Sequence, residues 1–367
     1  MSSRVASLDA CRGIAVFSVF LYHIYELKVV PEGAAFFSGW PILGMFGVDL
    51  FYVLSGFFIV LAIIKPKEWS PIFFMRARIQ RIYPAYLVSL FIIVLLSLFF
   101  RSGFSADEYL VANVFMHLTM THNFLPGVGG SINGVYWTLG VEFPYYILML
   151  GLAVFFRDKR FFLPLTIFLI LLSLVWRHSI FVFGPQDAYW RFFSSSQLLG
   201  VLDAFGIGGL VAYVFHGEAG GESIKKYRWG ILAVSLIILA FLLYMFERNS
   251  GEYWFVWSYS VLWRTFLYGA FGGVILGLVY MKGVKSYCLL GLDKLGEISF
   301  SFYLYHLVIM IFINNSLSDF HYLVRIFFIT TCSLLVSWVS WRFVEKPFYT
   351  RKSDSYNGGV TICQSVA

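Results

Sequence analysis

Charged residues are scarce in this chain. Only 13% of its 367 residues are charged, whereas 59% are hydrophobic. A typical soluble domain is about a quarter charged and about half apolar. The 27 lysines and arginines and the 20 aspartates and glutamates are too few to cover the surface of a soluble protein of 42.1 kDa. The composition therefore excludes a soluble enzyme and a disordered chain, and it predicts a protein that crosses the lipid bilayer several times.

Cysteine is also rare, and the four cysteines lie far apart in the chain. They form no CxxC pair and no cluster with histidine, so the sequence supports neither a disulfide framework nor a metal site. The formal charge of +7 would suggest a nucleic-acid partner in a soluble protein. In a membrane protein such an excess reflects basic cytoplasmic loops, and we expect no nucleic-acid partner. The cysteines are Cys11, Cys288, Cys332 and Cys363.

Ten apolar segments approach the roughly 20 residues that a membrane-spanning helix needs. If the N-terminus is cytoplasmic, 20 of the 27 lysines and arginines fall on the cytoplasmic side, in agreement with the positive-inside rule. The sequence therefore predicts an all-α, polytopic membrane bundle of about ten transmembrane helices with both termini in the cytoplasm. A further segment, 108–120, is too short to span and is expected to be buried or interfacial. The ten segments are 6–27, 43–64, 83–100, 134–156, 161–177, 197–215, 229–246, 259–281, 296–314 and 322–342.

The first segment contains three ionisable residues, which are costly inside a bilayer and are therefore candidates for function. Arg12 interrupts the apolar run and no small-residue cleavage site follows, so we interpret this segment as a retained helix and not as a signal peptide. His23 follows Arg12 by close to three helical turns, which places both on one face about 16 Å apart along the axis. Asp9 can pair with Arg12 across one turn. The alternative is that Arg12 anchors the helix at the membrane surface and His23 makes a packing hydrogen bond.

Two carboxylates are expected at a depth similar to that of His23. Asp49 lies about two turns inside the outer boundary of the second segment and has no basic neighbour in its own helix, and Glu142 lies at a similar depth in the fourth segment. A carboxylate that holds one imidazole nitrogen lets the other take a proton from a hydroxyl. His23, Glu142 and Asp49 are therefore candidate catalytic residues, with a purely structural His–Glu pair as the alternative.

Two arginines precede the third segment. Arg78 and Arg81 share a helical face because they are three residues apart, and they lie beside Tyr83 and Tyr86 at the boundary where Arg12 is also expected. The forked guanidinium group suits phosphate, so these arginines predict a site for an anionic, phosphate-bearing ligand from the cytoplasm. The alternative is the ordinary basic charge of cytoplasmic loops.

The ninth segment places Tyr303 and His306 in the middle of the membrane. His306 is open to three interpretations: a proton relay, a contact to a sugar, or a packing residue. The other histidines are expected to be solvated in loops or near membrane boundaries; they are His117, His122, His178, His216 and His321.

Six short motifs occur in order along nearly the whole chain. With them the chain resembles the acyltransferase-3 family, membrane acyltransferases that O-acetylate sugars and other hydroxyl acceptors. The match is incomplete beside Glu142, where the family usually has a second acidic residue and a glutamine and this chain has Phe143 and Pro144. The motifs are SLDACRGIAVFSVFLYH, GVDLFYVLSGFFI, RARIQRIYPAY, YWTLGVEFPYY, SFSFYLYH and WRFVEKPF.

The resemblance implies a reaction and roles for these residues. The donor would be an acyl-coenzyme A, most often acetyl-CoA, which is a substrate and not a resident cofactor. Arg12, Arg78 and Arg81 match the family's basic motifs and would hold the donor's phosphates, while His23 would be the general base, oriented by Glu142. In an alternative mechanism His23 is itself acetylated and then deacylated by the acceptor. Residues that would contact the sugar are Trp137, Tyr136, Tyr303 and His306.

The implied acceptor is a carbohydrate: a surface polysaccharide, the O-antigen of lipopolysaccharide, or a lipo-chitooligosaccharide nodulation factor. The resemblance assigns residues 1–348 to a transmembrane acyltransferase domain, 349–367 to a short polar cytoplasmic tail, and the protein to a bacterial inner membrane. The principal rival is a proton-coupled transporter, but transporters often contain internal repeats and none is visible here. A non-catalytic membrane sensor of acyl donors is a third possibility.

Overall fold

The computed structural model describes residues 6–31, 40–66, 68–100, 110–281 and 290–350. Every regular element within these ranges is helical. The α-helices are α1 (Ala6–Glu26), α2 (Gly47–Ile64), α3 (Pro71–Phe100), α4 (Leu110–Leu118), α5 (Leu139–Arg157), α6 (Lys159–Phe183), α7 (Ala188–Ser195), α8 (Leu198–His216), α9 (Glu218–Asn249), α10 (Arg264–Val279), α11 (Leu292–Glu297), α12 (Ser299–Ser316), α13 (Tyr322–Ser340) and α14 (Lys346–Thr350).

By length and composition, nine helices in the described part of the chain could cross a membrane. They correspond to nine of the ten predicted segments, and the remaining segment, 296–314, is α12, a helix of 18 residues. The predicted non-spanning segment 108–120 contains the short helix α4. The prediction of an all-α, polytopic membrane bundle is therefore confirmed, while the cytoplasmic location of the termini and the domain boundary at 348 stay predictions. Most of the predicted tail, 351–367, lies outside the described residues.

The third spanning helix begins earlier than the sequence analysis expects. The prediction starts it at residue 83, but α3 begins at Pro71 and continues through Pro84. Proline suits the first position of a helix because its missing N–H would have no partner there. Arg78 and Arg81 therefore lie inside α3 and share one of its faces.

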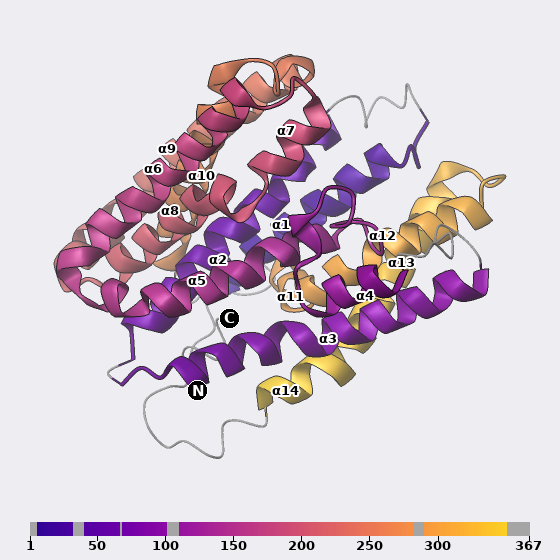
Figure 1. Ribbon diagram of the computed structural model, residues 1–367, viewed down its shortest axis with the longest axis horizontal. Coiled ribbons are helices and arrows are strands. Elements are labelled where there is room, and N and C mark those ends of the chain that lie inside the picture. Colours follow the sequence, from indigo (N-terminus) through magenta and orange to yellow (C-terminus); the bar gives the residue numbers. More distant parts are fainter. Residues whose placement is uncertain (1–5, 32–39, 67, 101–109, 282–289, 351–367) are drawn as a thin grey trace.

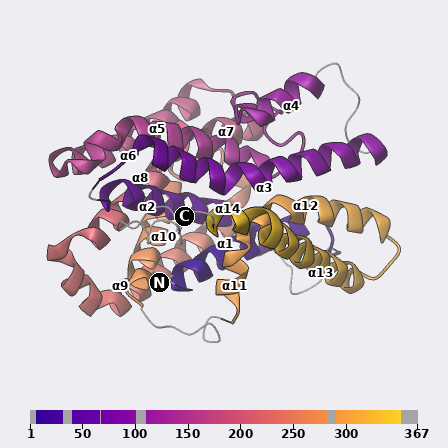
Figure 2. The same cartoon turned by 90° about the horizontal axis from the view of Figure 1, so that it is seen from below.

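Helices α1 and α2 lie at the centre of the bundle. They pack against each other, α2 packs against α8, and α1 packs against α12; Figures 1 and 2 show α12 and α13 on one side of α1, with α6, α8, α9 and α10 on the other. The most apolar 18 residues of the first two spans are 61% and 72% buried, against 17% for the span in α9 and 22% for the span that starts with α13. The two central helices are therefore more deeply buried in the protein than α9 and α13, and they carry His23, Arg12 and Asp49.

Glycines allow α2 and α8 to approach at backbone distance. A Cβ atom on Gly208 would lie 2.0 Å from the carbonyl oxygen of Val53, and one on Gly56 would lie 2.3 Å from that of Phe205. Both distances are far below van der Waals contact, so only glycine fits at these positions. Small residues at helix interfaces are a common means of close packing in membranes, and here they fix the position of α2 relative to the rest of the bundle.

Candidate active site

Three arginines from two helices line one cavity, which we call the arginine cavity. Arg12 comes from α1, and Arg78 and Arg81 come from α3. The cavity has a volume of about 100 Å³. The structure thus brings together the three arginines that the sequence analysis selected from separate segments. The other residues that line the cavity include Val48, Phe51, Ser55, Phe58, Glu142, Tyr146, Phe300 and Tyr303.

Aromatic rings support the guanidinium groups of this cavity. The guanidinium carbon of Arg12 lies 4.4 Å from the ring centroid of Phe58, and that of Arg81 lies 5.6 Å from the ring of Phe300. A cation over an aromatic face is attracted by the ring quadrupole, more strongly where water is excluded. The rings therefore hold the arginine side chains in place without using their N–H donors.

Two carboxylates balance part of the positive charge. Asp9 Oδ1 lies 3.6 Å from Arg12 Nη1, which confirms the predicted pair across one helical turn. Glu345 Oε2 lies 3.2 Å from Arg81 Nη1, and Glu345 also accepts a hydrogen bond from Ser301. Glu345 was not predicted from the sequence, although it belongs to the terminal motif WRFVEKPF. A guanidinium group has five N–H donors, so pairing with one carboxylate does not use them all.

Glu142 belongs to the arginine cavity. Its Oε1 accepts hydrogen bonds from Ser55 Oγ and from the Tyr146 hydroxyl, each 2.6 Å long. His23 lines a different cavity and is hydrogen-bonded to His306. The prediction that Glu142 orients His23 is therefore wrong: equal depth in the membrane did not make the two side chains neighbours.

A second and larger cavity, with a volume of about 620 Å³, contains His23; we call it the histidine cavity. The C-terminal end of α1, the loop before α5, the helix α7 and the loop after α9 all contribute to its wall. Its volume falls within the roughly 300–1,000 Å³ of typical small-molecule pockets, whereas the arginine cavity is smaller than that range. Its aromatic lining consists of Tyr22, Trp137, Tyr189, Phe192, Phe193, Trp254 and Tyr303, besides the imidazole ring of His23.

Hydrogen bonds determine which nitrogen of His23 carries the proton. His306 Nδ1 lies 2.9 Å from the carbonyl oxygen of Phe302, and because a carbonyl only accepts, Nδ1 must be the protonated nitrogen of His306. The other nitrogen of a neutral His306, Nε2, is then an acceptor, and it lies 3.0 Å from His23 Nδ1. His23 Nδ1 therefore donates, and His23 Nε2 keeps its lone pair. This is the tautomer that a general base needs.

The carboxylate of Glu26 lies beside Nε2 of His23. Glu26 Oε2 is 3.8 Å from His23 Nε2, and Glu26 Oε1 accepts a hydrogen bond of 3.2 Å from the Tyr22 hydroxyl. The Glu26 side chain is 50% exposed, and a carboxylate in this position favours a positive charge on His23. Glu26 was not predicted from the sequence, although its spacing of three residues from His23 on a helix indicates that the two side chains can meet.

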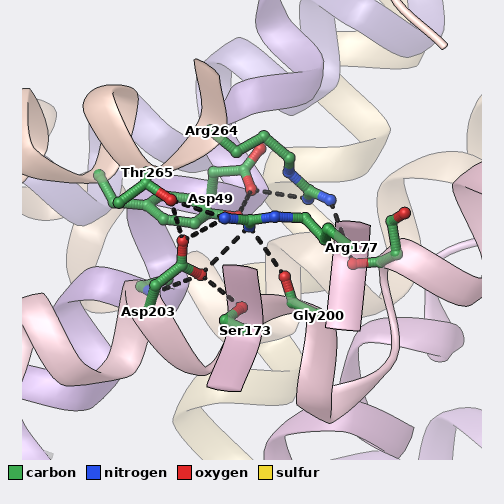
Figure 3. A network of polar contacts seen from close by, with 10 residues as sticks. Asp49, Ser173, Arg177, Gly200, Asp203, Arg264 and Thr265 are labelled. Carbon is green, nitrogen blue, oxygen red and sulfur yellow. Dashed lines mark hydrogen bonds and ion pairs between the residues drawn. The ribbon is translucent and has the colours of Figure 1, made fainter. Parts of the chain in front are cut away.

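Asp49 lines the histidine cavity but is held in an ion pair. Its Oδ1 lies 2.9 Å from Arg264 Nη2 and accepts a hydrogen bond of 2.8 Å from the Tyr268 hydroxyl; Figure 3 shows Arg264 above Asp49. As the sequence indicated, Asp49 has no basic partner in its own helix; α10 supplies the partner. Asp49 binds α2 to α10, and its carboxylate is not hydrogen-bonded to His23 in the described structure.

A second buried ion pair lies next to the first (Figure 3). Arg177 Nη2 is 2.6 Å from Asp203 Oδ2, and both side chains are fully buried. Thr265 and Ser173 donate further hydrogen bonds of 2.5 Å and 3.0 Å to the carboxylate, and Arg177 also donates to the carbonyl oxygen of Gly200. This network joins α6, α8 and α10. The sequence analysis did not single out either charge, although an aspartate inside the apolar segment 197–215 was visible.

The four predicted sugar contacts occupy different places. Trp137 lines the histidine cavity. Tyr136 lines neither cavity: it is fully buried and its hydroxyl lies 2.6 Å from Ser89 Oγ, so its prediction as a substrate contact is wrong. His306 is also fully buried and lines neither cavity. Its ring is hydrogen-bonded to His23. Tyr303 lines both cavities, and among the described residues Val48 is the only other one that does so.

Two further histidines are buried, contrary to the expectation that they are solvated. The rings of His117 and His122 stack at 4.3 Å with an interplanar angle of 7°, and both side chains are fully enclosed. His122 Nε2 lies 2.9 Å from the carbonyl oxygen of Tyr136. Burial and the neighbouring His122 lower the pKa of His117 to about 4, and burial lowers the pKa of His122. Both rings are therefore neutral at pH 7, and they tie α4 to the loop that carries Trp137.

This stack makes the protein sensitive to acid. Because the pKa of folded His117 is about 4 and its ordinary value is 6.5, the unfolded state binds more protons below pH 6.5, and stability falls as the pH drops from 6.5 towards 4. At pH 5 we expect a loss of about 2 kcal/mol relative to pH 7 from this group. The free energy of unfolding in detergent, measured at both pH values, tests this expectation. His117→Phe keeps a ring in the stack and should reduce the loss; an equal loss in both proteins would exclude His117 as its source.

The fold and the two cavities define a class of protein. It is a polytopic helical membrane protein in which an arginine-lined cavity adjoins a cavity with a histidine whose free nitrogen can act as a base. Within the described ranges, no group of three or more His, Cys, Asp or Glu side chains could hold a metal ion. The chain belongs to the acyltransferase-3 family, since the model of that family's acyltransferase domain matches residues 5–342.

Three proteins that are similar to this chain come from one virus and two bacteria. ORF330 of Acidianus two-tailed virus, whose name proposes an acetyltransferase, is 27% identical over 83% of this chain and 82% of its own length. The peptidoglycan O-acetyltransferase OatA of Listeria monocytogenes is 24% identical over 96% of this chain. SACOL0978 of Staphylococcus aureus strain COL, whose name proposes an O-acetyltransferase, is 23% identical over 94% of this chain. The chain covers only 57% of the length of each of these two bacterial relatives. No solved structure matches this chain.

Proposed function

We propose that this protein is a membrane-bound O-acetyltransferase that moves an acetyl group from cytoplasmic acetyl-CoA to a hydroxyl group of a carbohydrate acceptor. The acceptor is a surface polysaccharide, an O-antigen or a lipo-chitooligosaccharide, and the membrane is the bacterial inner membrane. One observation carries the proposal: His23 has its Nε2 lone pair free at a cavity of ligand size, and that cavity shares a wall with one lined by three arginines.

The arginine cavity is the donor side. Guanidinium groups bind phosphate with paired N–H donors. Arg12, Arg78 and Arg81 each supply one guanidinium group to this cavity. A volume of about 100 Å³ is too small for a whole nucleotide thioester, since pockets for ligands of that size begin at roughly 300 Å³. The cavity therefore takes the narrow thioester arm, and the nucleotide lies at its mouth.

The histidine cavity is the acceptor side. Trp137, Trp254 and Tyr22 present aromatic rings there, and rings with a polar edge suit a sugar, which has apolar C–H faces and polar hydroxyl groups. The larger volume of this cavity, about 620 Å³, leaves room for the acceptor beside His23.

Transfer then needs one proton acceptor. His23 Nε2 takes the proton of the acceptor hydroxyl while the hydroxyl oxygen attacks the thioester carbonyl carbon, the C–S bond breaks, and the proton passes from His23 to the thiolate of coenzyme A. His306 Nε2 accepts from His23 Nδ1 throughout, and Glu26 lies 3.8 Å from Nε2, so both favour the imidazolium that forms. Positioned proton transfer of this kind contributes about 10²–10⁴-fold to a rate.

The test uses the full-length protein in sealed vesicles with acetyl-labelled acetyl-CoA and a mixture of surface glycans. Label that becomes esterified to a glycan supports the proposal. Label that accumulates inside the vesicles without an ester would overturn it in favour of transport, and donor binding with neither outcome would favour a sensor. Mass spectrometry of glycans from cells with and without the protein then identifies the acceptor, because one acetyl group adds a known mass.

Replacing Arg78 tests the donor side. Arg78 is only 4% exposed and its guanidinium carbon lies 6.0 Å from the ring of Tyr146 in the arginine cavity. In Arg78→Gln we expect the KM for acetyl-CoA to rise about tenfold or more, because a hydrogen bond to a charged group is lost, while kcat changes little. Arg160→Gln is the matched control, since Arg160 is exposed and lines neither cavity. An unchanged KM for acetyl-CoA in Arg78→Gln would show that Arg78 does not bind the donor and belongs to the ordinary basic charge of the cytoplasmic side.

A further inference from the structure

Two of the described residues belong to the wall that the arginine cavity and the histidine cavity share. Val48, in the first turn of α2, and Tyr303, in the second turn of α12, each line both cavities. A residue in the wall of two cavities presents one side to each. A route from the arginine cavity to the histidine cavity through their shared wall therefore passes Val48 and Tyr303.

Tyr303 is the rigid side of this constriction. Its hydroxyl lies 3.0 Å from the carbonyl oxygen of Val135 and 3.0 Å from Thr138 Oγ1, so the segment before α5 holds the end of the ring. The ring centroid lies 6.4 Å from that of Phe51 and 5.9 Å from that of His306. The ring is thus packed between the lining of the arginine cavity and the partner of His23.

Val48 is the aliphatic side, and nothing polar holds it. It is half-buried and offers only methyl groups to the space opposite Tyr303. The volume left between the two residues therefore depends on the size of the side chain at position 48.

We propose that Val48 and Tyr303 form the acyl-binding constriction of the enzyme and that Val48 limits the donor to short acyl chains. This inference rests on the proposed function. In that reaction the thioester arrives from the arginine cavity and the hydroxyl is activated from the histidine cavity, so the carbonyl carbon must lie where the two cavities meet. The acyl methyl group then lies against Val48, and each further carbon of a longer acyl chain has to displace it.

The experiment compares donors in one preparation. The purified full-length protein is given acetyl-CoA, propionyl-CoA or butyryl-CoA with a fixed glycan acceptor, and the ratio of kcat/KM for propionyl over acetyl transfer is measured. Val48→Ala removes two methyl groups, and one methylene of space in an apolar pocket changes selectivity by about 10–200-fold. We expect the ratio to rise about tenfold or more. Because it is a ratio, a partly unfolded preparation does not alter it.

Two further variants make the result decisive. Val16→Ala loses the same two methyl groups from a fully buried position on α1 that lines neither cavity, and its ratio should equal that of the unaltered protein. Val48→Ile adds one carbon and should lower the ratio, which decides the matter if Val48→Ala does not fold. If the variants of Val48 transfer acetyl with an unchanged ratio of propionyl to acetyl transfer, the proposed role of Val48 in acyl selection is wrong. The proposed function would remain intact. Failure of the unaltered protein to transfer acetyl to any glycan would overturn the proposed function itself.

Discussion

Replacing His23 by alanine is expected to lower kcat for acetyl transfer by about 10²–10⁴-fold, the contribution of a positioned general base. The KM for acetyl-CoA should change little, because His23 lines the histidine cavity and the arginines line the other. Initial rates of glycan acetylation, measured over a range of acetyl-CoA concentrations, separate the two effects. Retained turnover in His23→Ala would remove His23 from the mechanism.

His306→Phe is the matched test of the histidine pair. It keeps a ring between Phe20 and Phe302, which lie at centroid distances of 6.2 Å and 5.7 Å, but it removes the nitrogen that accepts from His23 Nδ1. Without that acceptor the tautomer of His23 is no longer fixed, so we expect a loss of kcat smaller than that of His23→Ala. The pH dependence of kcat/KM should also change shape. A purely structural role of His306 would lower the rate by the same factor at every pH.

Replacing Asp203 by leucine is expected to lower the free energy of unfolding by about 3–5 kcal/mol, because removal of one partner leaves the charge of Arg177 buried and uncompensated. The pair is fully buried and 2.6 Å apart, and Arg177 and Thr265 both depend on the carboxylate. Chemical unfolding in detergent measures the effect.

The double variant Arg177→Met, Asp203→Leu separates charge from shape. It removes both charges and should be less destabilised than Asp203→Leu alone, since replacing a whole buried pair by apolar residues is often close to neutral. Asp158→Asn is the surface control: its pair with Arg160 is also 2.6 Å long but largely exposed, and exposed pairs contribute little. If the double variant is as unstable as the single one, lost hydrogen-bond geometry, and not the uncompensated charge, is the main cause of the destabilisation.

Much of the architecture could be predicted because each step depended on local sequence. Nine of the spanning helices follow from apolar length, and the pair of Asp9 with Arg12 follows from helical spacing. The meeting of Arg12 with Arg78 and Arg81 was predicted from a shared membrane side and a shared chemistry. The start of α3 was missed because Lys65 to Arg81 reads as a polar loop, although the chain is helical from Pro71.

The partners of the buried polar groups could not be predicted in the same way. Depth along a helix can be counted from the sequence, and by depth His23, Glu142 and Asp49 were equivalent. Which helix faces which depends on packing, and the backbone contact between α2 and α8 at Gly56 and Gly208 has no signature that names its partner. For this reason His306 and Arg264 emerged as partners only from the structure.

The sequence alone thus determined that the chain is a helical membrane protein with basic groups gathered at one end of the bundle and a histidine about three turns further along the same face of α1. Only the tertiary structure decided that the histidine is held by a second histidine and that two cavities meet at Val48 and Tyr303. The physical reason is that helix formation and membrane insertion depend on residues close in sequence, whereas hydrogen-bond partners and cavity walls come from residues such as His23 and His306, which are 283 positions apart.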